Sequence, residues 1–250
     1  FKVLYRALEG LGKTLDVHRQ STPKDELLTR LQRHDDPYIL VLDEVDQLEE
    51  EDVLYDLYSM EHIHIVMIAN REEDVFAGMD ERIRSRLMGC RRIRAGHYGL
   101  AELVDILEDR VEWGLQPGSV NEQVLEEVAD AAAGDARLAI AILRSAARTA
   151  EQEREDEITV EMVTDAVPDA KESERQKNVE KLNDHQKAVY DVVDEEGPLP
   201  PGELYQRYEE TVAEPRTERT VRKYVNKMEH YNLVESQGER KGKRIDTVTG

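Results

Sequence analysis

The sequence is poor in cysteine and in the large aromatic side chains. Of its 250 residues, one is Cys, one is Trp and two are Phe. The single Cys90 excludes an internal disulfide and any zinc site built from several cysteines, and it fits a reducing cytosol. The scarcity of Trp and Phe argues against a platform that stacks the bases of single-stranded nucleic acid.

Long hydrophobic runs are also missing. The longest lie near residues 38–42 and 63–69, far short of the roughly 18 apolar residues of a membrane span. Phe1 and its neighbours have no signal-peptide character and there is no initiator Met. We therefore expect a fragment of a cytoplasmic protein with no membrane partner.

Negative charge is in large excess. The chain has 34 Lys and Arg against 55 Asp and Glu, a net charge of −21, which opposes binding to nucleic-acid phosphates. Residues 216–250 are the exception, with nine Lys and Arg against five Asp and Glu. The acidic, lysine-poor surface predicts a halophilic source with high intracellular salt.

The apolar pattern divides the chain into four stretches. Residues 1–96 alternate β-rich and helical runs, typical of an α/β domain, and residues 97–168 are all-helical. Residues 169–182 are mostly charged and predict a linker or a solvated helix. Residues 183–250 predict three helices and a hairpin, as in a winged helix.

Local signals define single elements. The apolar runs Tyr38–Leu42 and Ile63–Ala69 predict strands buried on both faces of a parallel sheet. Ser119–Glu122 predicts a capping box, and Pro168 predicts the end of the helix before it.

The strongest chemical signal is a Walker B pattern, in which the apolar strand runs directly into Asp43 and Glu44. At the strand end Asp43 can hold Mg²⁺ through water, and Glu44 can polarise the water that attacks a γ-phosphate. The alternative is an ordinary strand leading into an acidic turn.

Three further features follow in the order found in AAA+ ATPases. Asn70 ends the next strand and resembles sensor 1, which orients the attacking water. The helix around Ser85 resembles the arginine-finger box, with Arg86 as first choice and Arg82 as second. Gly134–Arg137 resembles sensor 2, in which Arg137 contacts the γ-phosphate. The alternatives are solvated arginines on an amphipathic helix and at a helix N-terminus.

Two apparent motifs are rejected. Gly10–Thr14 looks like the end of a P-loop, but Ala7 stands where the first glycine is required. The apolar spacing before it is helical, so we expect a helix with a glycine stop, and a Walker A loop upstream of Phe1. His62 and His64 have no Cys or carboxylate partner set and predict no metal site.

The segment from residue 217 to residue 230 has the layout of a recognition helix. Val221, Tyr224, Val225 and Met228 follow helical spacing and predict a buried back, while the opposite side is basic and amide-bearing. The basic tip of the following hairpin can reach phosphates or a minor groove. The residues expected to bind DNA are Arg216, Arg219, Thr220, Arg222, Lys223, Asn226, Lys227, Arg240, Lys241, Lys243 and Arg244. The alternative is a winged helix used for protein contacts.

Together these residues resemble the archaeal replication initiators related to the origin recognition complex and the cell-division-control initiator. The features that carry the resemblance are Leu40–Asp46, Asp52–Leu57, Asn70, Arg82–Ser85, Gly134–Arg137, Asp184–Gln186 and the wing. The resemblance implies an AAA+ ATPase core, incomplete here, with a helical lid and a C-terminal winged helix. It also implies ATP or ADP and Mg²⁺ as cofactors.

The same resemblance implies the partners and the activity. These are double-stranded origin DNA, the replicative helicase and other initiator copies, with slow ATP hydrolysis in the full-length protein and none in this chain alone. The segment from Tyr58 to Ile63 is shorter than in many members, which leaves out a second DNA contact.

Two other functions stay open. One is a clamp-loader or helicase-loader ATPase without sequence-specific DNA binding, which the basic helix argues against. The other is a non-catalytic winged-helix regulator on a degenerate ATPase scaffold, which the intact Asp43 and Glu44 pair argues against.

Overall fold

The computed structural model describes residues 1–14, 17–18, 22–48, 52–76, 79–238 and 242–248. The chain forms two compact units, Phe1–Arg92 and Ile93–Gly250. Each unit has two clusters of buried hydrophobic residues.

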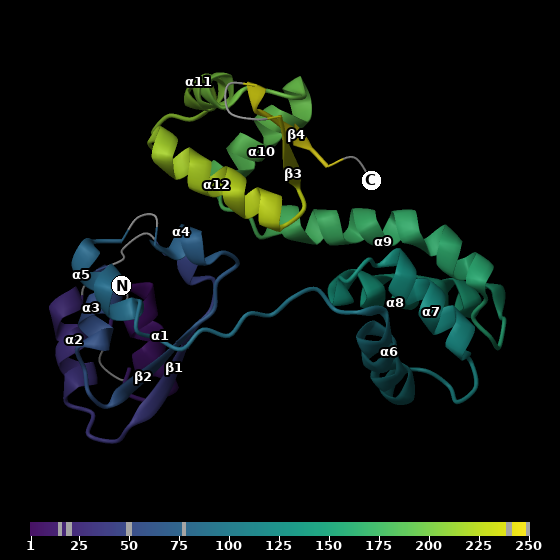
Figure 1. The fold of residues 1–250 in the computed structure, drawn as a ribbon, viewed down its shortest axis with the longest axis horizontal. Helices are drawn as coiled ribbons and strands as arrows, with labels where there is room; N and C mark the ends of the chain where they lie inside the picture. The colour runs from purple at the N-terminus through teal and green to yellow at the C-terminus, as the bar shows by residue number, and fades with distance from the viewer. Residues whose placement is uncertain (15–16, 19–21, 49–51, 77–78, 239–241, 249–250) are drawn as a thin grey trace. The chain divides into compact units, whose positions relative to one another are not determined.

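The first unit is built on a two-stranded parallel sheet, in which β1 (Tyr38–Leu42) pairs with β2 (Ile63–Met67) (Figure 1). One face of the sheet is covered by α1 (Lys2–Gly10), α2 (Lys24–Gln32) and α3 (Asp52–Tyr58). A short 3-10 helix, η1 (Val45–Gln47), follows β1, and α4 (Glu72–Phe76) and α5 (Glu81–Leu87) follow β2.

The other face of this sheet is exposed within the unit, so the prediction of strands buried on both faces is wrong for the described residues. Ile39 is 68% exposed, Val41 56% and Val66 47%. Successive side chains of a strand point to opposite faces, and α1, α2 and α3 pack only against the face that carries Leu40 and Ile65.

The end of α1 confirms the expected glycine stop. Gly12 has a φ of +67°, and its N–H donates to the carbonyl of Glu9 at 3.0 Å. The N–H of Lys13 donates to the carbonyl of Leu8 at 2.9 Å. This pair of bonds is the Schellman motif that ends a helix, so Gly12 terminates α1 rather than forming part of a phosphate-binding loop.

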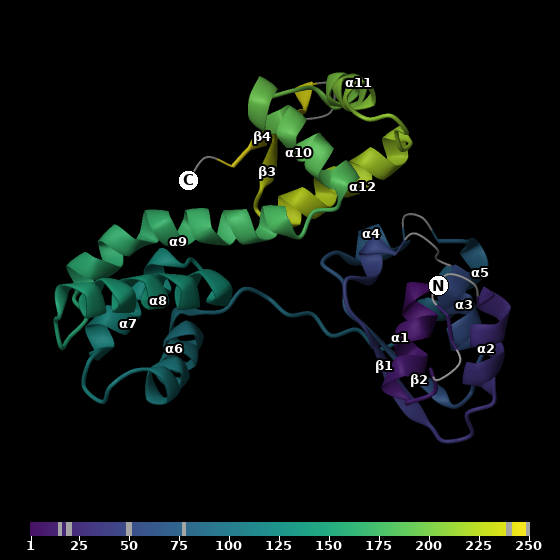
Figure 2. The same ribbon diagram turned by 180° about the vertical axis from the view of Figure 1, so that it is seen from behind.

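The second unit begins with a helical bundle of α6 (Leu100–Gly114), α7 (Glu122–Ala131), α8 (Ala136–Glu153) and the first half of α9 (Val160–Glu180) (Figure 2). The cap of α7 corrects one prediction. Asn121, rather than Ser119, accepts from the N–H of Val124 at 3.0 Å. Ser119 instead donates to the carbonyl of Gln116.

Helix α9 corrects two predictions. It does not end at Pro168 but continues to Glu180, and the segment expected to be a linker or solvated helix is its second half. A proline inside a helix removes one hydrogen bond. Packing compensates, since Ala170 lies in the bundle core and Val179 packs against the core of the next subdomain. No helix among the described residues has the length and apolar character of a membrane span.

The winged helix completes the second unit. It contains α10 (Asp184–Glu196), α11 (Pro201–Thr211), α12 (Glu218–His230) and an antiparallel hairpin of β3 (Val234–Gln237) and β4 (Arg244–Thr247). A bridge between Leu199 and Ile245 adds a third segment to the hairpin. The hairpin and the three helices agree with the elements expected from the sequence.

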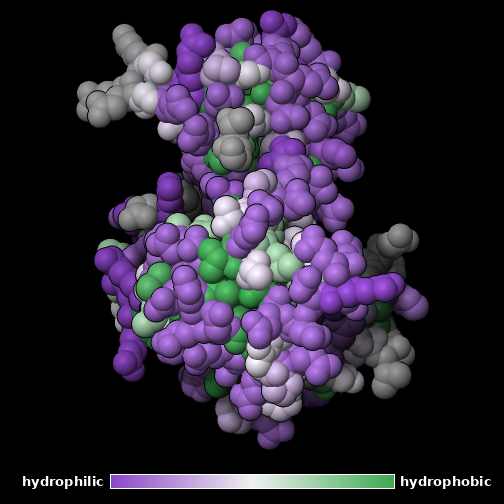
Figure 3. Space-filling view, turned by 90° about the vertical axis from the view of Figure 1, so that its right-hand side faces the viewer, coloured by the Kyte–Doolittle hydropathy of each residue, from purple (hydrophilic) through white to green (hydrophobic). Residues whose placement is uncertain are grey.

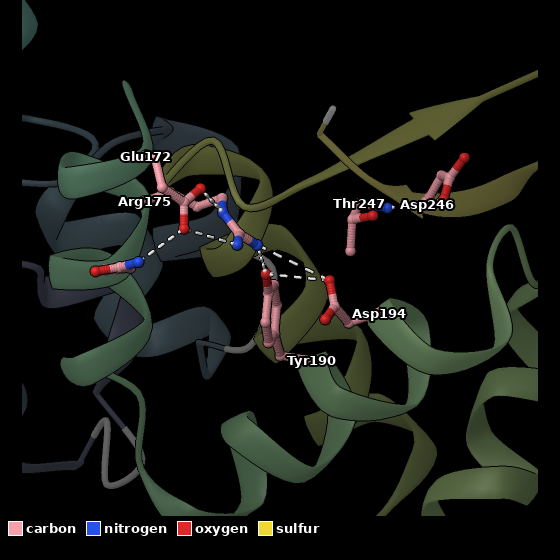
Figure 4. A network of polar contacts seen from close by, with 7 residues as sticks. Glu172, Arg175, Tyr190, Asp194, Asp246 and Thr247 are labelled. Atoms are coloured by element: carbon pink, nitrogen blue, oxygen red, sulfur yellow. Dashed lines mark hydrogen bonds and ion pairs between the residues drawn. The ribbon is translucent and has the colours of Figure 1, made fainter. Parts of the chain in front are cut away.

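A polar network joins α9 to α10 (Figure 4). Arg175 donates to Glu172 at 2.7 Å and to the hydroxyl of Tyr190, and it lies 3.8 Å from the carboxylate of Asp194. Hydrogen bonds from Arg175 and Gln176 lower the pKa of Glu172, and burial raises the pKa of Tyr190. The network therefore fixes the second half of α9 on the winged helix.

Replacing Arg175 with Met should loosen this junction. We expect a loss of about 1 kcal/mol in the free energy of unfolding, because the charged hydrogen bonds are partly exposed. Faster amide exchange should be confined to α10 and the second half of α9. Lys177→Met is the control, since Lys177 pairs with Glu174 on the same helix. Equal effects of the two substitutions would contradict the role of Arg175.

Gly134 precedes α8 and combines two constraints. Its φ is +92°, and an added Cβ would lie 3.0 Å from the Cβ of His97 and 3.2 Å from the carbonyl of Tyr98. Its own carbonyl accepts from the N–H of Tyr98 at 3.3 Å. A side chain here is therefore strained by both the backbone and its neighbours.

Gly134→Ala should reduce the free energy of unfolding by about 1–3 kcal/mol, measured by urea denaturation. Gly118→Ala is the matched control, because Gly118 has a φ of +85° with nothing within 4 Å. The control should cost less, since it carries only the backbone strain. A loss at Gly118 as large as at Gly134 would show that the close approach of residues 97–98 is unimportant.

Candidate functional site

The carboxyl ends of β1 and β2 bring three of the expected site residues to one edge of the sheet. Leu42 and Met67, the last residues of β1 and β2, pair with each other. Asp43 and Glu44 after β1 and Asn70 after β2 therefore follow the same edge of the sheet. The N–H of Ile68 donates to the carbonyl of Leu42 at 2.8 Å, and the N–H of Val45 donates to the carbonyl of Ile68 at 3.0 Å. These two bonds tie the acidic turn to the segment before Asn70.

Glu44 has an unusual backbone. Its φ is 52° and its ψ is 42°, a left-handed conformation that a residue with a Cβ adopts at a cost of roughly 1–2 kcal/mol. Its N–H donates to the carboxylate of Asp43 at 2.9 Å, which orients that carboxylate. Strain held at the end of a strand next to polar side chains is a recurrent feature of functional sites.

The chemistry of Asp43 fits the expected Mg²⁺. Its side chain is exposed at the strand end. The described residues contain no group of three or more His, Cys, Asp or Glu side chains that could hold a metal by themselves. Mg²⁺ is commonly bound by one or two carboxylates together with substrate phosphates and water, so a single oriented carboxylate suits this ion.

The two candidate finger arginines lie on α5 in different surroundings. Asp80 caps α5 by accepting from the N–H of Arg82 at 2.8 Å. The guanidinium of Arg86 lies 4.7 Å from the ring centre of Tyr55 and 5.9 Å from that of Tyr58, a cation–π arrangement. The guanidinium of Arg82 is exposed and has no bonding partner among the described residues.

The tyrosines under Arg86 were not expected as functional residues. Tyr55 and Tyr58 are 37% and 44% exposed on α3. The available signal was their spacing of three residues on a helix, which places both side chains on one side. Exposed aromatic rings three residues apart are suited to receive a cation.

Arg137 lies in the second unit, at the first turn of α8. Asp135 caps this helix by accepting from the N–H groups of Arg137 and Leu138, at 2.8 and 3.2 Å. The Arg137 side chain is exposed, and the described part of the chain gives it no hydrogen bond or ion pair. A cation at a helix N-terminus lies next to N–H groups that attract anions.

Helix α12 has the buried apolar side and the polar, basic side that the sequence predicts. Val221, Tyr224, Val225 and Met228 are buried in the core of the winged helix. Among the expected DNA-binding residues of this helix, Arg219 and Arg222 are exposed, and Thr220, Lys223, Asn226 and Lys227 are partly buried. The amine of Lys227 lies 5.3 Å from the ring centre of Tyr231.

Two tyrosines position the start of α12. The hydroxyl of Tyr208, which bonds Nδ1 of His185 at 2.8 Å, accepts from the N–H of Arg216 at 3.1 Å. The hydroxyl of Tyr205 donates to the carbonyl of Arg216 at 3.3 Å. Helical spacing does not reveal these two bonds to Arg216, because Arg216 lies eight and eleven residues further along the chain than the tyrosines.

The wing is tied to the rest of its subdomain. Arg244 donates to the carbonyl of Pro198 at 3.2 Å, and the amine of Lys243 lies 3.9 Å from the carboxylate of Glu229. Arg240 and Lys241 lie outside the described residues. His62, for which the sequence predicts no metal site, contacts the carbonyl of Leu31 through Nε2 at 3.0 Å.

Known proteins resemble this chain along its whole length. Residues 104–168 match the Cdc6 AAA+ ATPase-type lid domain. ORC1-type DNA replication protein 9 of Halobacterium salinarum is 46% identical over 99% of this chain and 70% of its own length. ORC1-type DNA replication protein 1 of the same organism is 46% identical over 89% of this chain and 72% of its own length. The predicted halophilic character fits these relatives.

A solved structure supports the same assignment. The Aeropyrum pernix ORC1 protein in complex with DNA superposes with a TM-score of 0.66 and 28% identity, over 99% of this chain and 72% of its own. Cdc6p from Pyrobaculum aerophilum shares the fold, with a TM-score of 0.56, 23% identity, and coverage of 98% and 72%. The chain belongs to the ORC1-type DNA replication proteins and has the AAA+ fold with a helical lid and a C-terminal winged helix.

Proposed function

We propose that this protein initiates DNA replication by binding duplex DNA at an origin, recruiting the replicative helicase and switching conformation with bound ATP. The single observation that carries the proposal is α12, which presents basic and amide side chains on a fully packed back. In a chain of net charge −21, the basic side of α12 is an exception to the acidic composition. Its amide and guanidinium groups are the types that read base edges in a major groove.

The residues at the strand ends support a role in nucleotide hydrolysis. ATP would supply the γ-phosphate, and Mg²⁺ would neutralise its developing charge. Asp43 would hold the metal, Glu44 would take a proton from the attacking water, and Asn70 would orient that water. Arg137 would contact the γ-phosphate from the lid. Hydrolysis would act mainly as a switch, with a slow rate.

The phosphate-binding loop requires residues that Gly10–Thr14 do not supply, because Gly12 ends α1. The two Halobacterium relatives are longer than the part that aligns, since this chain covers 70% and 72% of them. We place the loop in that additional part. The 250 residues alone are then inactive as an ATPase.

Arg82 and Arg86 remain the candidates for a finger that reaches a nucleotide on a neighbouring copy. To reach outward, Arg86 would have to leave the rings of Tyr55 and Tyr58. The side chain of Arg82 would have no partner to leave among the described residues. This difference favours Arg82 as the finger and gives Arg86 a role in holding α5 on α3.

Glu44→Gln in the full-length protein should retain ATP binding and reduce the hydrolysis rate about 100-fold or more, because the amide cannot accept the proton of water. Single-turnover hydrolysis and nucleotide binding are measured separately. Glu61→Gln is the control, since Glu61 is an exposed carboxylate before β2, at the opposite end of the strand. Unchanged turnover in the Glu44 variant would remove that residue from its role.

Lys223→Ala combined with Arg240→Ala should weaken binding to duplex origin DNA. The slope of log affinity against log salt should become shallower by about 1 for each phosphate that the removed side chains neutralise. Lys171→Ala with Lys187→Ala removes the same charge at exposed positions of α9 and α10. If the control pair flattens the slope equally, net charge rather than the recognition helix and wing accounts for the binding.

A further inference from the structure

The turn between α11 and α12 is held by side chains. Arg216 lies just before Thr217, which caps α12 by accepting from the N–H of Thr220. Neither backbone group of Arg216 bonds to another backbone group among the described residues. Both bond to hydroxyls of α11 instead, because the N–H of Arg216 donates to Tyr208 at 3.1 Å and its carbonyl accepts from Tyr205 at 3.3 Å. The peptide groups on both sides of Arg216 therefore depend on two tyrosines.

The hydroxyl of Tyr208 is the better anchor of the two. Tyr208 is fully buried, and its hydroxyl also lies 2.8 Å from Nδ1 of His185 on α10. A hydroxyl has one proton to donate and lone pairs that accept, so accepting from Arg216 leaves its proton for an unprotonated Nδ1. Tyr205 is partly exposed, and a hydrogen bond with Glu209 raises its pKa. The carbonyl of Arg216 thus shares the Tyr205 hydroxyl with a carboxylate, whereas Tyr208 joins α10, α11 and the turn.

Arg216 is a cation at the N-terminal end of α12, and its side chain is exposed. Most of the surface seen in Figure 3 is hydrophilic, so exposure alone does not mark a residue that binds DNA. Arg216 differs because its main chain is fixed on both sides. The N-terminal end of the second helix is the part of a helix-turn-helix that reaches the bases, and arginine commonly donates to the phosphates beside them.

We propose that Tyr208 is a positioning residue for DNA binding, which holds the main chain of Arg216 so that its guanidinium meets one phosphate in a fixed geometry. The inference rests on the proposed function and adds the group that sets the register of α12 on its DNA. A phosphate contact carries no sequence information, but it places the helix so that contacts to base edges form. On an unrelated duplex no register is preferred, and the attraction of Arg216 to phosphates depends little on geometry.

The test compares two duplexes that bind the 250-residue chain. One is selected by the chain from a library of random duplexes, and the other is a shuffled sequence of the same composition. Tyr208→Phe should weaken binding of the selected duplex about fivefold or more, because the hydroxyl is lost while the ring remains. Binding of the shuffled duplex should stay within about twofold. Both affinities are measured by fluorescence anisotropy at the same salt concentration.

Tyr190→Phe is the matched control. Tyr190 is also buried in the winged helix, but its hydroxyl bonds to Arg175 on α9 and not to the turn before α12. The control should leave the affinity for the selected duplex unchanged.

A double-mutant cycle tests whether Tyr208 acts through Arg216. Arg216→Ala removes the guanidinium that Tyr208 positions, so it should weaken the selected duplex by itself. Adding Tyr208→Phe to Arg216→Ala should then weaken binding by no more than about twofold further. A role of Tyr208 in stability alone would instead leave its effect the same in both backgrounds.

Circular dichroism checks that each variant is folded. If Tyr208→Phe does not fold, Tyr205→Phe takes its place, since it removes the hydroxyl on the carbonyl of Arg216 and should weaken the selected duplex about threefold.

Three results would overturn the inference and leave the proposed function intact. These are an unchanged affinity of the tyrosine variant for the selected duplex, an equal loss on both duplexes, and an undiminished effect of Tyr208→Phe in the Arg216→Ala background. A wild-type chain that binds no duplex, or selects no sequence, would overturn the proposed function together with the inference.

Discussion

The second unit depends on one helix that packs against two different cores. Val163 and Ala170 of α9 lie in the core of the helical bundle, and the partly buried Val179 packs against the core of the winged helix. Arg175 adds the polar contacts to α10. Because a helix transmits position along its length far better than a flexible linker does, the lid and the winged helix are joined by a stiff connection. Changes at either end of α9 are therefore expected to be felt at the other.

In the first unit, the equivalent constraint is the pairing of two parallel strands. Parallel pairing puts both carboxyl ends at the same edge, and the bond from Val45 to Ile68 extends the pairing beyond the strands. In the acidic turn that follows, the backbone of Glu44 has a left-handed conformation. The fold positions the polar groups through backbone hydrogen bonds, so their arrangement does not depend on contacts among exposed side chains.

Charge is unevenly distributed along the chain. Acidic residues outnumber basic ones 55 to 34 overall, whereas residues 216–250 have nine Lys and Arg against five Asp and Glu. Several basic groups are engaged by the protein itself, as Arg175 is by Tyr190 and Arg86 is by two tyrosines. High salt weakens the attraction between exposed charges. Contacts that also bury apolar surface are therefore better suited to a cell with high intracellular salt.

Local periodicity predicted most of the helices, the wing and the strand ends, because the spacing of apolar residues records which side of an element meets a core. The acidic pair at Asp43 and Glu44 and the basic side of α12 were predicted for the same reason. The periodicity of apolar residues does not show where α9 ends or which face of the sheet is covered, and both are decided by the tertiary structure. Pro168 lies inside a helix because the residues after it pack against two cores, and one sheet face is exposed because helices pack only on the other.

The remaining differences have the same physical origin. Asn121 rather than Ser119 caps α7, and Arg86 lies on two tyrosines from another helix. A cleft lined by Arg144 and Arg148 exists only once α6, α8 and the turn before α9 are assembled. The sequence by itself determined the elements and the chemical character of their faces, since these follow from neighbours within a few residues. Contacts between distant residues decided which faces are covered and which arginines are held, because packing energies exceed local preferences.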